Sequence, residues 1–381
     1  MTDTQTRLDP ALTDPATLPS SDLVDLLAAI CDIESVSGDE TALADAVEAL
    51  LRDQPHLDVH RDGDAVVART TLGRDRRVVL AGHLDTVPLT DPPNLPTRLT
   101  GTGDDRELWG RGTVDMKAGI AVMLALAVEL GRPGAEPVAD VTYVFYDHEE
   151  VEESKSGLGR LARNRPDLLA GDFAVLGEPT SADIEGGCQG TLRVDVRTRG
   201  VAAHSARSWR GENAIHAAAP ILALLAGYDA AQVEVDGLVY REGLNAVGIT
   251  GGIAGNVVPD ACTVTVNYRF APSRTLAEAE QHLRELFADH EVVVTDASPA
   301  ARPGLDDPLA AEFVAAVLAR TGGAPKPKFG WTDVARFAEL GIPAVNFAPG
   351  DPLLAHADDE RVRVAELAVC RGALRDWLRG A

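Results

Sequence analysis

The sequence predicts an α/β protein with a second, smaller domain inserted into the first. Wholly apolar strands alternate with helical patterns in the N-terminal half and again near the C-terminus, which is typical of a sheet covered by helices. Between these regions the strand "GTLRVDVRTRG" instead alternates apolar and polar residues, which is typical of a sheet with one exposed face. A chain of 381 residues is long enough for two ordinary domains.

The first part, residues 1–186, opens with two helical patterns, Leu23 to Ile33 and Thr41 to Leu51. A hairpin with an Asp-Gly turn is predicted in "DVHRDGDAVVART", and a buried strand in "RRVVLAGHLDTVP". The apolar run "AGIAVMLALAVEL" is too short to cross a bilayer and is interpreted as a buried helix. Two further strands, "DVTYVFY" and "DFAVLGEPT", flank a helical segment near 157–163.

Residues 187–296 are predicted to form the inserted α+β domain. Its strands are expected in "GTLRVDVRTRG", in "VGITGGIAGNVVPDACTVTVNYRF" and in "EVVVTDA". Helical patterns run from Asn213 to Leu225 and from Leu276 to Asp289. These elements suffice for a small sheet with a helical layer.

The last part, residues 297–381, returns to the α/β character of the first. It contains helical patterns from Pro308 to Arg320 and from Val362 to Trp377, with the short strand "PAVNFAP" between them. The main domain is therefore predicted to be discontinuous, formed by residues 1–186 and 297–381.

Composition limits the classes of function. The 35 basic and 59 acidic residues give a formal charge of −24, which argues against nucleic acid or an anionic membrane as partner. The four cysteines are isolated, with no CxxC pair for a thiolate zinc site, as expected for reduced structural cysteines. The polar N-terminus does not resemble a signal peptide. We therefore expect a cytoplasmic protein.

Polar residues follow the predicted strands, and sites in open α/β sheets lie at the carboxyl ends of strands. His83 and Asp85 are two residues apart in "LAGHLDTVP", so their side chains are expected to share one face. A carboxylate beside a histidine is a common way to orient a metal ligand, although the pair is also compatible with a simple hydrogen bond at a strand end. Asp115, in "GRGTVDMKAG", precedes the apolar helix and reads equally well as part of a helix start.

The stretch "VFYDHEEVEES" places several carboxylates directly after an apolar strand. In an extended segment successive side chains point to opposite sides, so Glu149 and Glu150 are expected to do different jobs. One would ligate a metal and the other would act as a base toward water. Glu178 follows the next strand, and His356 lies in a polar loop near the C-terminus. Two histidines and several carboxylates without cysteine suit a divalent site, most simply zinc.

The motifs "GHLDTVP", "GRGTVDMKAG", "YDHEEVE", "GEPT" and "AHADDE" occur in the order typical of the co-catalytic zinc amidohydrolases. The chain resembles this family, which includes carboxypeptidase G, acetylornithine deacetylase, aminoacylase and succinyl-diaminopimelate desuccinylase, over nearly its whole length. The middle of the chain, with "GGIAGNVVPD", "NYRF" and "GWTDVARF", is most similar to the actinobacterial desuccinylases.

The resemblance implies two metal ions, zinc with cobalt or manganese as substitutes, that share Asp115. It further implies that the Asp115–Met116 peptide bond is cis, that Glu149 is the general base and that Asp85 braces His83. The implied ligands are His83, Asp115 and Glu178 for one metal and Asp115, Glu150 and His356 for the other.

For the inserted domain the resemblance implies a ferredoxin-like lid that also forms a homodimer. His204 in "AAHSA" is the candidate oxyanion-stabilising residue, although some relatives use a histidine near the position of Ser208 or Trp209. The substrate contacts would be Arg269 in "NYRF", Asn256 in "GNVVPD" and Thr332 in "GWTDVARF".

The implied activity is hydrolysis of N-succinyl-LL-2,6-diaminopimelate to succinate and LL-2,6-diaminopimelate, a step of lysine biosynthesis. A sibling deacylase or peptidase acting on N-acetylornithine, an N-acyl amino acid or a dipeptide is the alternative, because a metal centre of this kind acts on the amide alone. A third hypothesis is a non-catalytic binding protein on the same scaffold. It is disfavoured because every implied metal ligand and Glu149 are present.

Overall fold

The computed structural model describes residues 20–380. The chain divides into two compact units. The first unit comprises residues up to Gly186, Gly304–Lys326 and the residues from Arg336 onward, and the second comprises Gly187–Pro303 and Pro327–Ala335. The described helices include none that is both long enough and apolar enough to cross a membrane.

The first unit is built around a mixed sheet of eight strands, which confirms the predicted α/β class. Strands β3, β6, β7 and β18 run parallel to their neighbours within this group, whereas β1 and β2 form an antiparallel hairpin that continues onto β6. In spatial order the strands are β1 (Asp58–Asp62), β2 (Ala65–Arg69), β6 (Asp140–Tyr146), β3 (Arg77–His83), β7 (Phe173–Leu176), β18 (Ala344–Asn346), β8 (Glu185–Gly186) and β17 (Lys326–Pro327).

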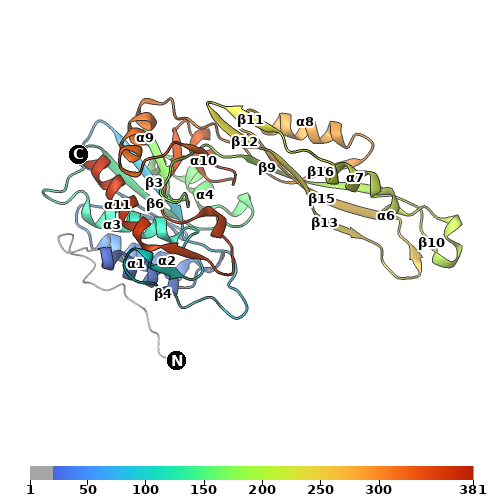
Figure 1. The fold of residues 1–381 in the computed structure, drawn as a ribbon, viewed down its shortest axis with the longest axis horizontal. Coiled ribbons are helices and arrows are strands. Elements are labelled where there is room, and N and C mark those ends of the chain that lie inside the picture. The colour runs from blue at the N-terminus through green and yellow to red at the C-terminus, as the bar shows by residue number, and fades with distance from the viewer. Residues whose placement is uncertain (1–19, 381) are drawn as a thin grey trace. The chain divides into compact units, whose positions relative to one another are not determined.

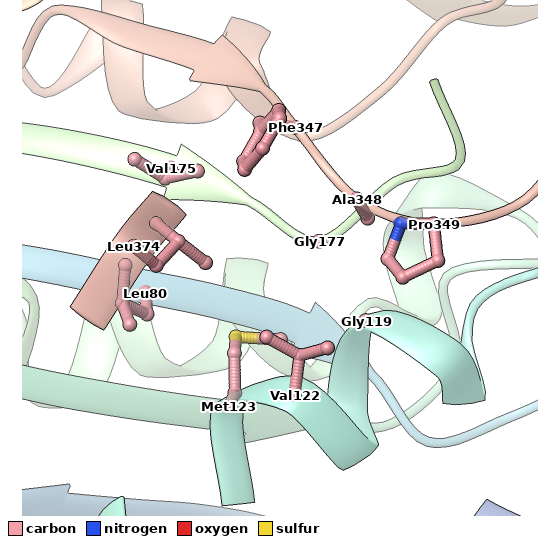
Figure 2. A pocket seen from close by; sticks show the side chains of 10 residues that line it. All are labelled: Leu80, Gly119, Val122, Met123, Val175, Gly177, Phe347, Ala348, Pro349 and Leu374. Carbon is pink, nitrogen blue, oxygen red and sulfur yellow. The ribbon is translucent and has the colours of Figure 1, made fainter. Parts of the chain in front are cut away.

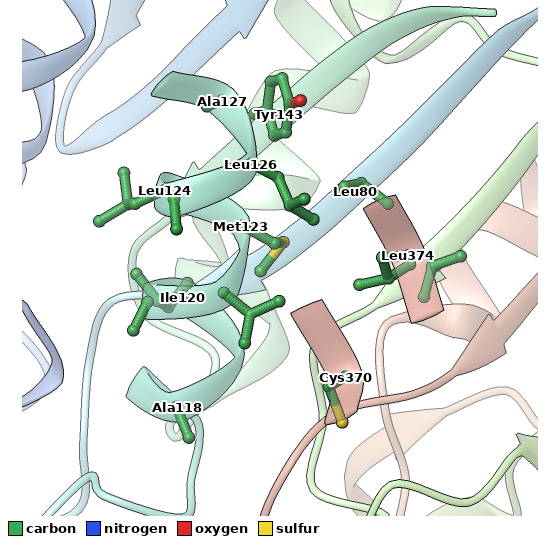
Figure 3. Packing of buried hydrophobic residues seen from close by; sticks show 14 of the residues in the cluster. Leu80, Ala118, Ile120, Met123, Leu124, Leu126, Ala127, Tyr143, Cys370 and Leu374 are labelled. Atoms are coloured by element: carbon green, nitrogen blue, oxygen red, sulfur yellow. The ribbon is translucent and has the colours of Figure 1, made fainter. Parts of the chain in front are cut away.

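One face of this sheet carries the main hydrophobic core. Helix α3 (Lys117–Glu129) is buried from Lys117 to Val128, as the predicted apolar helix requires. It packs beside α1 (Ser20–Asp32) and α11 (Val364–Arg379), and residues of α2 (Thr41–Arg52) and α9 (Pro308–Thr321) belong to the same core cluster (Figure 1). Figure 3 shows the apolar side chains of α3 beside Cys370 and Leu374 of α11. Helices α4 (Gly157–Asn164) and α5 (Pro166–Leu169) contact β2 and β6, and their buried leucines lie outside this core cluster.

Helix α3 makes a close backbone contact at Gly119 with the segment that follows β7. A Cβ atom on Gly119 would lie 2.1 Å from the carbonyl oxygen of Gly177, so only glycine permits this contact. The adjacent cavity between α3, β3, β7 and α11 is apolar and measures about 10 Å³, too small for a substrate (Figure 2). The close contact brings the start of α3, and with it Asp115, near Glu178, which lies two residues beyond the end of β7.

A small three-stranded sheet of the first unit was not predicted from the sequence. Strand β5 (Glu107–Trp109) lies between β4 (Arg98–Thr100) and β19 (Arg361–Arg363). The guanidinium groups of Arg98 and Arg361 lie over the ring of Trp109, at 5.2 and 4.6 Å from its centre. These strands are three residues long and rich in charge, so they carry no alternation from which a strand is recognised.

The second unit is a four-stranded antiparallel sheet with its own core. The spatial order is β13 (Gly243–Gly251), β15 (Ala261–Phe270), β9 (Gly190–Arg199) and β16 (Glu291–Ser298). From Val194 onward β9 alternates buried and less buried residues as predicted, and β15 shows the same alternation. Helix α8 (Leu276–Leu286) covers one face. The helix expected from Asn213 to Leu225 is instead two short helices, α6 (Ala214–Ala217) and α7 (Ala219–Ala226), because Pro220 favours a new helix start.

The remaining elements are short. The second unit also contains β10 (Ala203–His204) paired with β14 (Val257–Val258), and the hairpin of β11 (Gln232–Val235) and β12 (Leu238–Arg241). Helix α10 spans Val334–Glu339, and the 3-10 helices within residues 20–380 are η3 (Gly103–Asp105), η4 (Glu153–Lys155), η5 (Ser205–Arg210) and η6 (Pro352–Leu354).

Candidate metal centre

The side chains of the candidate centre converge at the carboxyl ends of three parallel strands of the first unit. His83 is the last residue of β3, Glu149 and Glu150 follow β6, and Glu178 follows β7. Parallel strands end at the same edge of a sheet, which brings these residues together. Two loops complete the centre by supplying Asp115 and His356.

Asp115 lies between the two histidines. Its Oδ1 is 3.3 Å from His83 Nε2, and its Oδ2 is 3.3 Å from His356 Nε2. Glu150 Oε1 lies 3.0 Å from the same nitrogen of His356, and Glu178 Oε1 lies 3.9 Å from His83 Nε2. Each carboxylate oxygen of Asp115 thus faces a different histidine.

Three groups of side chains in the described part of the chain have ligand atoms close enough to share a metal ion, within 4.8 Å of one another. Two of them, His83–Asp115–Glu178 and Asp115–Glu150–His356, have Asp115 in common. The third joins His83 with the adjacent glutamates Glu149 and Glu150. Imidazole nitrogens with carboxylate oxygens suit divalent cations such as Zn²⁺, Co²⁺ or Mn²⁺, so the residues present fit a dinuclear site.

The segment that carries the two glutamates is not the extended strand expected from the sequence. Strand β6 ends at Tyr146, residues 149–151 form a bend, and His148 has a φ of 59°, in the left-handed region. The expectation that Glu149 and Glu150 point to opposite sides was therefore wrong. The bend lets one oxygen of each approach His83.

Asp85 is fully buried and contacts three residues of the centre, His83, Glu149 and Glu150. Its backbone carbonyl lies 3.0 Å from His83 Nδ1, and its Oδ1 lies 3.4 Å from the same nitrogen. Its carboxylate also accepts hydrogen bonds from the backbone N–H groups of Glu149 and Glu150, both 3.0 Å, and from the Ser37 hydroxyl, 2.7 Å. One carboxylate thus orients a histidine and the backbone of both glutamates. No sequence pattern pointed to Ser37.

The charges of the centre are strongly coupled. Burial alone lowers the pKa of His83, but hydrogen bonds to Asp115 and Asp85 outweigh it and raise that pKa well above its usual value. Hydrogen bonds to Asp115 and Glu150 raise the pKa of His356 to about 10. Burial raises the pKa of Asp115, yet its bonds to both histidines leave that pKa below its usual value. Metal ions would replace the protons held by both histidines.

The peptide bond between Asp115 and Met116 is cis, as the resemblance implies. Asp115 lies two residues before the first residue of α3, Lys117. Its position is therefore set by the helix start on one side and by the loop from Gly110 on the other. Arg111 and Glu360, which hold this loop, were not singled out from the sequence.

The other predicted site residues belong to the second unit, whereas all residues of the metal centre belong to the first. His204 is exposed at the end of β10. The N–H of Ser205, the residue after His204, donates a hydrogen bond to the carbonyl of Asn256 at 2.9 Å, so His204 and Asn256 lie close together. Arg269 is half-buried on β15, opposite Gly243, and Thr332 is buried.

Comparisons with known proteins agree with this arrangement. The chain is 52% identical over 362 residues to a Mycobacterium tuberculosis protein named "Putative succinyl-diaminopimelate desuccinylase DapE", with 94% of this chain and 98% of that protein covered. It is 44% identical to a Corynebacterium glutamicum protein named succinyl-diaminopimelate desuccinylase, covering 94% and 96%.

Solved structures show the same fold at low identity. A tripeptidase from Staphylococcus aureus has a TM-score of 0.77 at 19% identity, covering 95% of this chain and 98% of that one. The YXEP protein of Bacillus subtilis, named a dinuclear metal-binding peptidase of the M20 family, has a TM-score of 0.69 at 16% identity, covering 97% and 98%. Residues 79–379 match the model of peptidase family M20/M25/M40, which includes every residue of the candidate centre. The chain therefore belongs to peptidase family M20/M25/M40.

Proposed function

We propose that the protein is a metal-dependent amide hydrolase that cleaves N-succinyl-LL-2,6-diaminopimelate to succinate and LL-2,6-diaminopimelate, in lysine biosynthesis. The chemistry is carried by one observation: Asp115 is shared between two histidine–carboxylate groups, with Glu149 beside them. The choice of substrate is supported by the two relatives that bear this name and match nearly the whole chain.

The metal ligands in this proposal are two sets that share one carboxylate. His83, Asp115 and Glu178 would hold one divalent cation, and Asp115, Glu150 and His356 the other. Zinc is the proposed native metal, with cobalt or manganese as substitutes. When bound, such cations polarise an amide carbonyl and make water more acidic.

Glu149 is the proposed general base. The hydrogen bond from its N–H to Asp85 fixes its backbone beside the metal ligands, 3.0 Å from the Asp85 oxygen. Its carboxylate takes a proton as the oxygen of water bonds to the amide carbon. It then gives that proton to the nitrogen as the carbon–nitrogen bond breaks, which leaves succinate and a free amine. Asp85 and Glu149 thus divide the work between orientation and proton transfer.

The second unit supplies the remaining proposed contacts. His204 would stabilise the negative charge that develops on the carbonyl oxygen, and Arg269, Asn256 and Thr332 would bind the anionic N-acyl amino acid. This unit would also act as a lid and form a homodimer. Support for the homodimer comes from the exposed edge strand β13, which presents unpaired backbone groups and the apolar side chains Val247 and Ile249. A cytoplasmic location is part of the proposal, supported by four cysteines that form no disulfide.

The test is steady-state hydrolysis by zinc-loaded protein, with N-succinyl-LL-diaminopimelate and N-acetylornithine compared side by side. We expect a kcat/KM at least ~100-fold higher for the succinyl substrate, a difference of roughly 3 kcal/mol in transition-state binding. Glu149→Gln keeps the shape of the base and should abolish turnover. Glu152→Gln is the matched control, because Glu152 is an exposed neighbour paired with Lys155.

Two results would contradict the proposal. Preference for N-acetylornithine would move the protein to the sibling deacylases and leave the metal centre intact. Full activity of Glu149→Gln would remove Glu149 from the role of base, whatever the substrate.

A further inference from the structure

We propose that the buried ion pair of Arg111 and Glu360 positions the metal centre by holding the loop of Asp115 and the loop of His356 in one register. Neither side chain belongs to a group that could hold a metal. The inference rests on the proposed dinuclear centre and adds two positioning residues to it.

Glu360 holds the backbone that leads into Asp115. Its Oε1 accepts hydrogen bonds from the N–H of Val114 at 2.9 Å and from the N–H of Asp115 at 3.2 Å. Its Oε2 accepts a hydrogen bond from Arg111 Nη1 at 2.8 Å. A single carboxylate thereby fixes the main chain of the residue that both proposed metal sites share.

Arg111 donates two further hydrogen bonds to backbone carbonyls outside its own loop. Its Nη1 also donates to the carbonyl of Ala357, the neighbour of His356, at 3.2 Å. Its Nε donates to the carbonyl of Pro88 at 3.1 Å, in the segment that follows β3 and His83. The planar guanidinium thus joins three ligand-bearing segments that are far apart in the sequence.

The small sheet explains how the pair forms. Strand β19 pairs with β5 in a register that sets Arg361 opposite Trp109. In continuation of this ladder, the N–H of Gly110 donates to the carbonyl of Glu360 at 3.0 Å. Arg111 follows Gly110 directly, so the register of two short strands brings the two charged residues together.

Burial makes this pair unlike the surface ion pairs of the molecule. Arg111 is 4% exposed and Glu360 2% exposed. A buried ion pair is weak evidence for net stability, because desolvation of both charges offsets their attraction. Its best-attested role is to select one geometry over others, which is what a bridging metal ligand requires.

The two proposed metal sites should depend on the pair to different degrees. His83 is held by strand β3 and by Asp85, independently of Glu360. His356 lies in a loop, its own φ of 63° falls in the left-handed region, and its side chain is 52% exposed. The site of His356 should therefore lose more when the pair is broken.

The experiment measures Co²⁺ binding by metal-free protein, followed by calorimetry and by the visible absorption of Co²⁺. Glu360→Gln keeps the size of the side chain but removes its charge and one acceptor. We expect the Co²⁺ affinity of the site that contains His356 to fall by ~10–100-fold and that of the site that contains His83 to change less than about threefold, with an altered spectrum for the ion at the site of His356.

Asp140→Asn is the matched control. Asp140 is another buried carboxylate that accepts backbone hydrogen bonds, from Leu72 and Arg74, and it lies 3.7 Å from Arg77. It stands at the start of β6, whereas the metal centre lies beyond the end of that strand. This variant should lose stability and keep both Co²⁺ affinities.

Unchanged Co²⁺ affinities in Glu360→Gln would overturn the inference, as would equal losses in Asp140→Asn. Arg111→Lys provides a second route if Glu360→Gln does not fold. Lysine keeps the positive charge but lacks the planar guanidinium that reaches both Pro88 and Ala357. Arg111→Lys should therefore weaken Co²⁺ binding at the site of His356, and unchanged Co²⁺ affinities in this variant would refute the inference. Wild-type protein that binds no second Co²⁺ would instead refute the dinuclear centre, and this inference with it.

Discussion

Asp85→Asn should damage both the stability and the activity of the protein, because one amide cannot replace the hydrogen bonds of the carboxylate. The two oxygens of Asp85 accept from Ser37, Glu149 and Glu150. An asparagine has one oxygen, so the N–H of either Glu149 or Glu150 must face an NH₂ group. A buried donor left without its acceptor costs about 1–3 kcal/mol.

The pKa of Asp85 gives a second measure of the same interaction. Burial raises this pKa, but bonds from His83, Ser37 and Glu149 outweigh it and bring the pKa from 3.8 to about 2. A lowered pKa in the folded state contributes stability above pH 4 that is lost as the pH falls toward 2. A shift of this size corresponds to roughly 2 kcal/mol of stability at neutral pH.

The assay has two parts. Urea unfolding of metal-free protein at pH 7 should show Asp85→Asn less stable by about 1–3 kcal/mol, with a smaller difference at pH 3. With metal added, kcat/KM should fall by ~10–100-fold. Ser37→Ala is the control, since it removes one donor and leaves both backbone N–H groups bonded. Wild-type stability and activity in Asp85→Asn would refute the reasoning.

Three further outcomes are expected. His356→Ala should bind one Co²⁺ instead of two, because it removes a ligand of only one site; calorimetry that still gives two ions would contradict this. Metal binding at pH 7 should release protons, because hydrogen bonds to Asp115 and Glu150 raise the pKa of His356 to about 10 in the metal-free protein. The metal affinity should therefore fall about tenfold for each unit by which the pH is lowered, for each proton released. Equal binding heats in buffers of different ionisation enthalpy would count against this prediction. Gly119→Ala should destabilise the protein by about 1–3 kcal/mol in urea unfolding, because its Cβ would meet the Gly177 carbonyl, whereas Gly255→Ala, which meets nothing, should be neutral.

The sequence by itself determined the elements whose signal is local. The apolar run of α3 and the strands β3, β6 and β7 were predicted because burial on all sides leaves a continuous apolar pattern. The ends of those strands also pointed to His83 and Glu178, since parallel strands bring their carboxyl ends to one edge. Asp115 and His356 required the order of several motifs, because neither has a distinctive local pattern.

Only the tertiary structure decided how the centre is supported. The bend that follows His148, which turns Glu149 and Glu150 toward His83, contradicts the extended segment expected from the sequence. The anchoring of both glutamates by Asp85 joins residues more than sixty positions apart. The contact of Glu360 with Asp115 depends on the register of β5 and β19, two strands too short to show a period. Such contacts depend on which distant segments meet, and that is determined by packing of the whole unit rather than by the residues beside each one in the chain.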